Sequence, residues 1–288
     1  MPKARITNTL RRLLKLIPTG RLTDKFFLLT IFVYAHKRLP SKGSGLFNDY
    51  LYFLKTSGEL LDILRQYTSD KVYLKSFVAE RLGQDATLPH SEVYDDVSQI
   101  TIDELPKPCV LKPAHGSGSV VFVDADQGHL TEGDVNKLQI ALATSPYTTA
   151  REANYKHLRR RIVCEPMLSS GAATKDYKVF CYRGEPKAIQ VDSERHSDHK
   201  RKIYTATWQP IDISYNFPVG EREPAPDNLH LMLDMARKLS SEFEFVRVDF
   251  FIDGVKVYVA ELTHCPESAH GRFETREAER RFSSLIFR

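Results

Sequence analysis

The sequence predicts an α+β protein whose sheets are mixed or antiparallel. Segments with alternating apolar residues and segments with helical spacing are interspersed, without the regular strand–helix–strand order of a parallel sheet. Two pairs of neighbouring strands are joined by short turns, at residues 183–185 and at Asp253-Gly254, so each pair is expected to run antiparallel. At 288 residues, 42% hydrophobic and 27% charged, the chain is long enough for two or three lobes that share a core.

Each predicted element has a local signal. Ser69 or Asp70 can cap a helix over 69–83 that Gly83 ends, and the spacing predicts further helices at 130–145 and 228–243. Strands are expected within 86–96, at 108–113, 119–126 and 159–168, twice within 176–195, and twice within 245–267. The polar stretch 192–228, with Trp208, is predicted to be irregular, and 276–282 to be an exposed helix.

Positive charge is concentrated at the start of the chain. Residues 1–40 contain nine Lys or Arg and one acid, Asp24, whereas the other 248 residues hold 32 Lys or Arg against 36 Asp or Glu. A basic segment of this kind suits nucleic acid, anionic lipid or a solvated helix. The mildly acidic body and the lack of a recognised motif argue against nucleic acid as a partner. The four cysteines form no C-x-x-C pair, which predicts reduced thiols in a cytoplasmic protein.

The apolar run at 26–35 lies within this basic segment. It is about half the ~20 residues needed to span a bilayer, and it lacks the pattern of a signal peptide. Together with residues 11–17 it could lie on the inner face of a membrane as an amphipathic segment. The alternative, a helix that packs its apolar face on the domain, is favoured.

A loop rich in glycine and serine separates two predicted strands. In VLKPAHGSGSVVFV, residues 110–123, Lys112 stands directly before many backbone N–H groups that little side chain covers. The loop matches neither G-x-x-x-x-G-K-[ST] nor G-x-G-x-x-G. Such a loop can still donate N–H groups to phosphate oxygens, with the lysine as a fixed positive charge. A surface hairpin with a solvated lysine explains the same residues, and this stretch alone does not separate the two.

Two acids interrupt the last strand pair. Asp249 in VRVDFFI and Glu261 in VYVAEL are costly to bury unless a cation neutralises them, so they predict a Mg²⁺ site shared with nucleotide phosphates. A two-residue turn at Asp253-Gly254 would put them on opposite faces, whereas an odd loop puts them on one face. The odd loop is expected, because six apolar residues then share a side: Val246, Val248, Phe250, Tyr258, Ala260 and Leu262. The alternative is a structural salt bridge between Asp249 and Arg247 or another cation.

Taken in order, these motifs resemble the ATP-grasp fold: Lys112 with its loop, IVCEPML, DYKVF, RVDFF and AELT. More narrowly, the chain is similar to the TupA-like ATP-grasp amidoligases, which are linked to teichuronopeptide and surface-polysaccharide synthesis. The stretches that carry this similarity lie between residues 45 and 275 and include SDKVYLKSFV, LPKPCVLKPAHGSGSV, DYKVFCYRGEPKAIQVDSERHSDHKRKIYTATW, KLSSEFEFVRVDFF and AELTHCPESAHGRF. The resemblance implies two α+β lobes that hold ATP between antiparallel sheets. It divides the chain into a basic helical segment (1–67), a central subdomain (68–108), a small lobe with the phosphate loop (109–168) and a large lobe with the Mg²⁺ site (169–288).

The resemblance also implies roles for individual residues. Nucleotide contacts are assigned to Lys112 and Lys71, to the loop residues His115, Gly116, Ser117, Gly118 and Ser119, to Glu165, Pro166, Met167 and Leu168 around adenine, and to Asp176 near the ribose. Lys178, Arg195 and Arg201 are placed where they reach phosphate or a carboxylate substrate. Asp249 and Glu261 match the Mg²⁺ ligands, and Thr263 stands where most ATP-grasp enzymes have an asparagine as third ligand. A threonine hydroxyl is a poorer metal ligand.

The implied chemistry is carboxylate activation. ATP, with Mg²⁺, phosphorylates a small-molecule or glycan carboxylate, and an amine converts the acylphosphate to an amide, which requires phosphate neutralisation and positioning more than a strong base. A glycosyl- or phosphoryl-transferring enzyme on the same scaffold stays open. So does a nucleotide- or glycan-binding relative without turnover, for which Thr263 argues. His196-x-x-His199 lacks a third ligand at fixed spacing, so a basic substrate-facing loop is favoured there over zinc.

Overall fold

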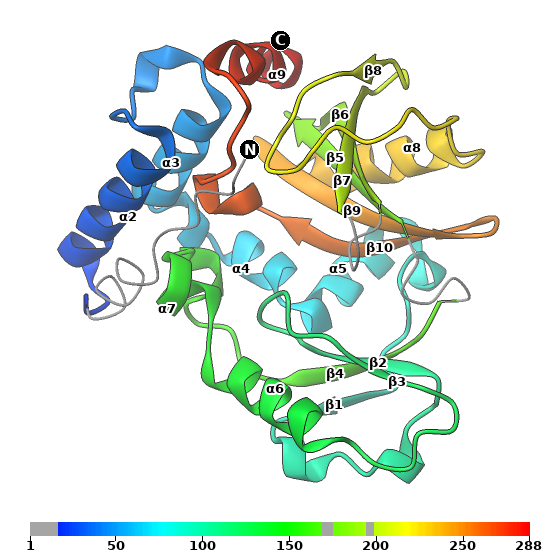
Figure 1. Ribbon diagram of the computed structural model, residues 1–288. Helices are drawn as coiled ribbons and strands as arrows, with labels where there is room; N and C mark the ends of the chain where they lie inside the picture. The colour runs from blue at the N-terminus through cyan, green and yellow to red at the C-terminus, as the bar shows by residue number, and fades with distance from the viewer. Residues whose placement is uncertain (1–16, 169–174, 194–198) are drawn as a thin grey trace.

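The computed structural model describes residues 17–168, 175–193 and 199–288, which form two lobes with a sheet in each (Figure 1). The four-stranded sheet has the order β1-β4-β2-β3, and the six-stranded sheet the order β10-β9-β5-β6-β7-β8. Every strand pair in both sheets is antiparallel. The predicted α+β class with antiparallel sheets is therefore confirmed.

The elements of the two lobes have the following bounds. The small sheet contains β1 (Glu92–Tyr94), β2 (Cys109–Pro113), β3 (Val121–Val123) and β4 (Ile162–Pro166). The large sheet contains β5 (Asp176–Tyr182), β6 (Glu185–Ser193), β7 (Lys200–Thr205), β8 (Pro210–Ile211), β9 (Phe245–Asp253) and β10 (Lys256–Thr263). The helices are α2 (Arg21–His36), α3 (Phe47–Ser57), α4 (Ile63–Ser69), α5 (Lys71–Leu82), α6 (Glu132–Ala143), α7 (Pro146–Ala150), α8 (Leu229–Ser240) and α9 (Arg276–Phe287), and a short 3₁₀ turn, η8 (Pro266–Ala269), follows β10.

Helix α5 begins and ends at the predicted caps, and α6 begins at a cap of the same kind. The Asp70 side chain accepts a hydrogen bond from the Val72 backbone N–H at the start of α5, and Gly83 follows its last turn. Thr131 and Asp134 form a reciprocal capping box at the start of α6. These local signals were sufficient because a cap depends on residues within one turn of the helix end.

Two predictions for polar segments are wrong. The stretch expected to be irregular contains β7, whose Arg201 and Lys202 are only 3% and 5% exposed. The alternation of buried and exposed residues in β7 could not be recognised, because some of its buried residues are charged. A charge is buried only with a partner, and the local sequence does not reveal that partner. The helix expected to be exposed, α9, buries Phe282 and Ile286 against the large sheet.

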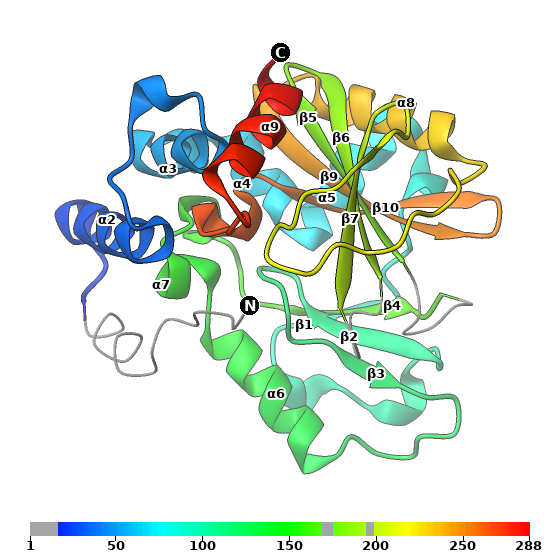
Figure 2. The same ribbon diagram turned by 45° about the horizontal axis from the view of Figure 1, so that its top comes forward.

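The two faces of the large sheet are covered differently. One face packs Val179, Val248 and Phe250 against apolar side chains of α5 and α8. Part of the opposite face packs Phe180 and Phe245 against α3 and α9, and the rest of that face lies toward the small lobe (Figures 1 and 2). The division leaves a strip of polar residues between the two lobes.

The apolar run at 26–35 forms most of α2, which packs on the domain. Phe27, Leu28, Ile31 and Phe32 are buried together with Tyr52 of α3. The favoured prediction for this run, a helix with its apolar face on the domain, is confirmed. Residues 11–16, the other part of the predicted membrane-surface segment, lie outside the described residues. Within the described residues, none of the helices combines the length and the hydropathy that a membrane crossing requires.

The β9–β10 hairpin corrects the predicted register. Its loop is even, with Gly254 and Val255 between the paired Asp253 and Lys256, so the odd loop is wrong. A β-bulge between Val259 and Glu261 adds the extra residue instead, and Asp249 therefore pairs with Glu261 on one face, as predicted. Before the bulge Val257 and Val259 face the apolar core, rather than the predicted Tyr258 and Ala260.

Candidate active site

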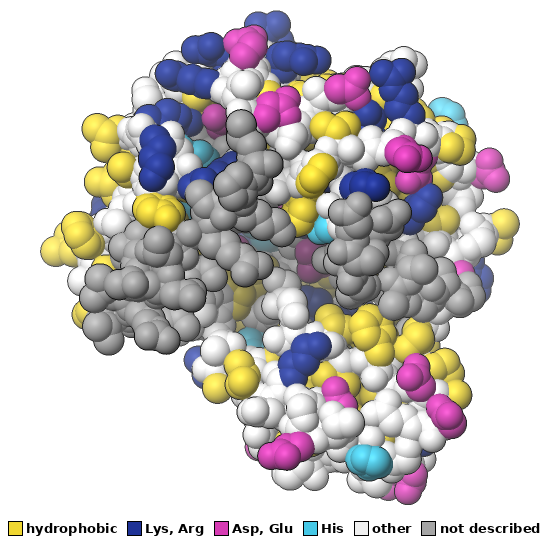
Figure 3. Space-filling view, viewed as in Figure 1, with side chains coloured by type: hydrophobic (Ala, Val, Ile, Leu, Met, Phe, Trp, Pro, Cys, Tyr) yellow, Lys and Arg dark blue, Asp and Glu magenta, His cyan; other side chains and the backbone are white. Residues whose placement is uncertain are grey.

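A cavity of about 660 Å³ lies between the two lobes, where the surface is hollowed in Figure 3. Among the described residues, its charged lining consists of Lys71, Lys112, Lys178, Arg201, Arg247, Glu152, Asp176, Asp192, Asp249, Glu261 and Glu267. Gly116, Ser117 and Gly118 of the β2–β3 loop also line it. The cavity therefore brings together the glycine-serine loop, its lysines and the acid pair of the opposite lobe.

Two lysines line the side of the cavity where the loop lies. Lys71, at the first turn of α5, donates to the carbonyl oxygen of Gly116 at 2.7 Å, and its Nζ is 3.7 Å from Glu261 Oε2. Lys71 thus connects the loop of the small lobe to an acid of the large lobe. Burial lowers the pKa of Lys71, and the nearby Glu261 opposes that shift. A phosphate group here would meet lysine charge and backbone N–H groups of the loop.

Lys112 belongs to a compact ionic cluster around Glu165. Its Nζ is 2.5 Å from Glu165 Oε2, while Lys75 Nζ and His90 Nε2 lie 3.0 and 3.5 Å from Oε1. Burial raises the pKa of the Glu165 carboxyl, but the charges of Lys112 and Lys75 and the contact with His90 outweigh burial and leave it well below its usual range. Glu165 is therefore an ionised carboxylate whose two oxygens are held by three side chains.

The acid pair lies directly across two strands. Asp249 and Glu261 are register partners, and Arg247 binds both oxygens of Asp249, each at 2.6 Å. Thr263 Oγ1 donates to Glu261 Oε1 and accepts from Arg247 Nη2, both at 3.1 Å. The salt bridge given as the alternative for Asp249 is thus present, on the same face as the predicted metal ligands. Burial raises the pKa of Asp249 to about 6, whereas Lys71 and Arg247 outweigh burial at Glu261 and lower its pKa to about 2.

The donor set fits a hard cation. Two carboxylates and a hydroxyl supply only oxygen, which Mg²⁺ prefers, and Mg²⁺ commonly takes one or two protein carboxylates together with phosphate oxygens. A cation bound by Asp249 would share that carboxylate with Arg247, which already donates to both of its oxygens. No group of three or more His, Cys, Asp or Glu with metal-binding geometry occurs in the described part of the chain.

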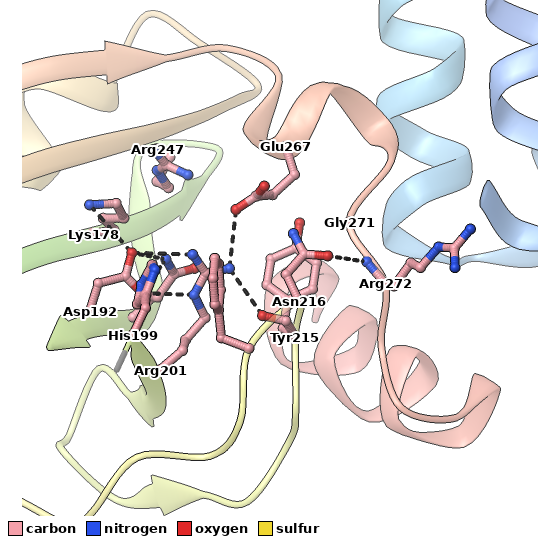
Figure 4. A network of polar contacts seen from close by, with 12 residues as sticks. Lys178, Asp192, His199, Arg201, Tyr215, Asn216, Arg247, Glu267, Gly271 and Arg272 are labelled. Atoms are coloured by element: carbon pink, nitrogen blue, oxygen red, sulfur yellow. Dashed lines mark hydrogen bonds and ion pairs between the residues drawn. The ribbon is translucent and has the colours of Figure 1, made fainter. Parts of the chain in front are cut away.

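A second polar network covers the wall beyond the acid pair (Figure 4). Lys178 Nζ lies 3.1 Å from Asp176, 3.7 Å from Asp192 and 3.8 Å from Asp249. Arg201 donates through Nε and Nη2 to the two oxygens of Asp192, at 2.7 and 3.2 Å. Burial raises the pKa of Asp192, but the contacts with its cationic partners outweigh burial and leave it well below its usual range. The cations on this wall are thus neutralised by carboxylates of the same wall.

The family of this chain follows from a model match. The model described as TupA-like ATPgrasp matches residues 53–286. The chain belongs to the TupA-like ATP-grasp family. Its two antiparallel sheets with a cavity between them are accordingly the two halves of an ATP-grasp fold. No curated protein matches the chain.

Solved structures with low sequence identity also match this TupA-like protein. An L-amino acid ligase from Bacillus licheniformis is 14% identical, with a TM-score of 0.45 over 76% of this chain and 49% of that one. A D-alanine–D-alanine ligase from Bacillus anthracis, complexed with ATP, is 15% identical, with a TM-score of 0.44 over 69% of this chain and 56% of that one. The chain thus spans about half the length of these two structures.

Most residues predicted for nucleotide and metal lie at the cavity, but several do not. His115 is 1% exposed: its Nδ1 accepts from the Arg161 N–H and its Nε2 lies 3.1 Å from the carbonyl oxygens of Ala141 and Thr144, so it joins β2 to α6. Ser119 and residues 165–168 do not line the cavity, and the Met167 N–H donates to the carbonyl oxygen of Pro108. Arg195 and His196 lie outside the described residues.

Sequence reasoning missed several residues that line the cavity, among them Glu267, Arg247, Asp192, Glu152 and Tyr155. Arg247 was considered only as a salt-bridge partner, although its spacing of two from Asp249 in a strand already puts the two side chains on one face. Asp192 sits at the end of an alternating strand, and only its pairing with β7 shows that it faces the site. Glu152 and Tyr155 lie between the helix predicted at 130–145 and the strand predicted at 159–168. No local signal marked them.

Proposed function

We propose that this TupA-like ATP-grasp protein is a MgATP-dependent ligase that joins a carboxylate to an amine. The observation that carries the proposal is the cavity itself, which faces a glycine-serine loop and two lysines on one side with the register pair Asp249 and Glu261 on the other. This arrangement suits a nucleoside triphosphate, because phosphate needs positive charge and N–H donors whereas Mg²⁺ needs carboxylates. Family membership supports the same function.

The proposed reaction has two steps. The γ-phosphoryl group of ATP passes to a carboxylate oxygen of the substrate, which yields ADP and an acylphosphate. The nitrogen of the amine then attacks the carbonyl carbon; the C–N bond forms, the bond to the phosphate oxygen breaks, and phosphate and a proton leave. Mg²⁺ would supply charge neutralisation, while Lys71 and Lys112 would orient the phosphates. Such chemistry relies on positioning, which agrees with a site made of fixed ionic contacts.

The central test is nucleotide binding. Calorimetry with MgATP is expected to give a binding isotherm for the wild type, and Lys112→Ala is expected to weaken it about tenfold or more, since a charge-assisted contact is lost. Lys238→Ala, at an exposed position of α8, is the matched control and should leave binding unchanged. Absence of MgATP binding in the wild type, with Lys112→Ala indistinguishable from it, would contradict the proposal.

The biological context is proposed more specifically. We place the ligase in surface-polysaccharide or teichuronopeptide-like glycan synthesis, with a glycan or small-molecule carboxylate as substrate. The basic N-terminal segment is proposed to contact an anionic membrane surface; Leu22 and Phe26 of α2 are 80% and 63% exposed and support this contact. Sedimentation with phosphatidylglycerol vesicles tests it: Leu22→Glu with Phe26→Glu should reduce binding, and binding equal to the wild type would contradict it.

One observation favours a second candidate, a nucleotide-binding protein without turnover. Arg247 holds both oxygens of Asp249, and Thr263 occupies the position of the asparagine that the family resemblance leads us to expect. MgATP binding without any ADP release, across paired panels of carboxylates and amines, would support this candidate over the ligase.

A further inference from the structure

The turn after β10 has an unusual backbone. Three consecutive residues other than glycine, Glu267, Ser268 and Ala269, have φ angles of 50°, 57° and 62°. L-residues adopt this left-handed region rarely and at a cost in free energy, and a run of three persists only where the surroundings hold it. Glu267 and Ser268 line the cavity. Strain of this kind gathers at functional positions, so the turn is a reason to look for a ligand there.

Three side chains of the N-terminal helices hold the turn. Lys55 of α3 is 5% exposed, and its Nζ donates to the carbonyl oxygen and hydroxyl of Ser268, at 3.1 and 2.8 Å, and to the carbonyl oxygen of Ala150 at 2.8 Å. Asn48 of α3 donates to the carbonyl oxygen of Gly271, and His36 of α2 bonds that of Ala269, both at 2.9 Å. All three N–H donors of the Lys55 ammonium are used within the protein, so Lys55 is a positioning residue and not a ligand for a substrate.

We call the contacts that His36, Asn48 and Lys55 make with this turn the clamp. The clamp positions the Glu267 carboxylate. Figure 4 shows it pointing toward Arg201, and Oε1 accepts from Arg201 Nη1 at 3.1 Å. Its side chain is 29% exposed, whereas those of Asp176, Asp192 and Asp249 are 4%, 2% and 5% exposed. Glu261 is comparably accessible at 32%, but it belongs to the proposed Mg²⁺ pair. Glu267 is thus an accessible carboxylate of this wall that the nucleotide and the metal do not account for.

The neighbours of Glu267 suit a cation better than an anion. Arg201 uses four of its five N–H donors on Glu267, on both oxygens of Asp192 and on the carbonyl oxygen of Tyr215, so two carboxylates already compensate its charge. The ring of Phe217 also lines the cavity, where it packs against the Arg201 guanidinium at 4.8 Å and against the ring of His199 at 3.6 Å. An accessible carboxylate is a common way to bind an alkylammonium group, through charge-assisted hydrogen bonds.

We propose that Glu267 binds the amine substrate as its ammonium ion, at the part of the cavity that Arg201 also lines. The inference rests on the proposed ligase function and identifies where its amine binds. In this proposal, helices α2 and α3 hold in place the turn that carries Glu267. His36 and Asn48 precede residue 53, at which the family match begins, so this part of the clamp lies outside the matched region.

The test compares charged and uncharged nucleophiles on the full-length protein. Hydroxylamine is largely uncharged at neutral pH and traps acylphosphates as hydroxamates, so it does not need a carboxylate to hold it. Alkylamines, amino sugars and amino-acid amides are ammonium ions at neutral pH. Each is supplied with MgATP and a panel of amino-acid and sugar-acid carboxylates, and hydroxamate, amide and ADP are measured for the wild type, Glu267→Gln, Glu267→Asp and Glu244→Gln.

Glu267→Gln is expected to keep hydroxamate formation and the KM for ATP, and to raise the KM for the ammonium substrate at least about tenfold, the effect of losing a charge-assisted contact. Gln retains an oxygen for Arg201, so the fold should be kept, and Glu267→Asp should recover part of the loss. Glu244→Gln, at an exposed site, should match the wild type.

Four results would overturn the inference. Glu267→Gln could leave the KM for the ammonium substrate unchanged, or it could reduce hydroxamate and amide formation equally, which would mark a structural role. A wild type that forms hydroxamate but uses no ammonium of the panel would show that the acceptor is not held as a cation. A wild type that forms neither product would refute the ligase function, and the inference with it.

Discussion

The two faces of the six-stranded sheet are built from alternate residues of the same strands, yet they are stabilised in different ways. On one face Val246, Val248 and Phe250 are fully buried against α5 and α8. On the other, Arg247 and Asp249 are nearly as buried, at 6% and 4% exposed, but they contact charged partners. The apolar face is stabilised by burial, which does not depend on which apolar side chain is the neighbour. The polar face is stable only if each buried charge has a partner of opposite charge. The same hairpin can therefore carry the core and the site.

Neighbouring phenylalanines give the largest expected contrast. Phe250→Ala removes a fully buried ring from the apolar face and should lower the free energy of unfolding by about 3–5 kcal/mol. Phe251→Ala is the matched variant on the other face, where Phe251 lines the cavity, and it should cost less stability while it weakens MgATP binding. Chemical denaturation and calorimetry of both variants test this. Equal losses of stability would show that the faces do not differ in this way.

Removal of one partner of a buried ion pair should have the next largest effect. Arg201→Leu leaves Asp192, 2% exposed, without its main partner and should lower the free energy of unfolding by about 3 kcal/mol at pH 7. Because the pKa of Asp192 is depressed in the folded state, its stabilisation is complete above an unfolded pKa of about 3.9 and is lost as the pH falls further. Denaturation curves should therefore converge below that pH. If the difference in the free energy of unfolding between the wild type and Arg201→Leu stayed constant at acidic pH, Asp192 would not be the group whose partner was lost.

Glu261→Gln should separate function from stability on the polar face. The side chain is 32% exposed, so the change in the free energy of unfolding should stay within about 1 kcal/mol. ADP release should nevertheless fall about 100-fold, because the carboxylate that is proposed to hold Mg²⁺ has lost its charge. Raising the Mg²⁺ concentration should recover part of the rate, and a rate equal to the wild type at low Mg²⁺ would exclude this role for Glu261.

The smallest effect is expected at Gln190. This residue is fully buried on the polar face, its Nε2 donates to both oxygens of Asp192, and its Oε1 has no hydrogen-bond partner within the described residues. Gln190→Leu loses the two hydrogen bonds but also removes the unsatisfied oxygen, so the free energy of unfolding should change by about 1 kcal/mol or less. Ile189→Gln, the adjacent position on the apolar face, is the control and should destabilise far more.

Features that depend on neighbouring residues could be predicted from the sequence. The caps of α5 and α6, the two strand pairs joined by turns and the loop beside Lys112 were all visible in single stretches. The β-bulge was not, because either an odd loop or an inserted residue puts Asp249 and Glu261 on one face, and only the pairing of the backbone decides between them. The prediction of the common face was therefore correct for a mistaken reason.

Partners from distant parts of the chain could not be predicted. His115 looked like a loop residue over phosphate, yet its ring bonds the end of α6, and burial lowers its pKa. Arg201 was expected to reach phosphate or a carboxylate substrate, yet Asp192 and Glu267 hold it. In each case the residue type was informative about polarity, but its role depends on residues brought close only by the fold.

The clamp on η8 also bears on where this protein can be divided. A fragment beginning at residue 53, where the family match starts, would retain every charged residue of the cavity but would lose His36, Asn48 and most of α3. It would also uncover the buried ring of Phe47 and the side chain of Leu51, which pack between the large sheet and α9. Truncation tolerance follows from the backbone and apolar surface a cut exposes. By that measure the folded unit extends to the start of α2, and a useful shortened protein would begin no later than residue 20.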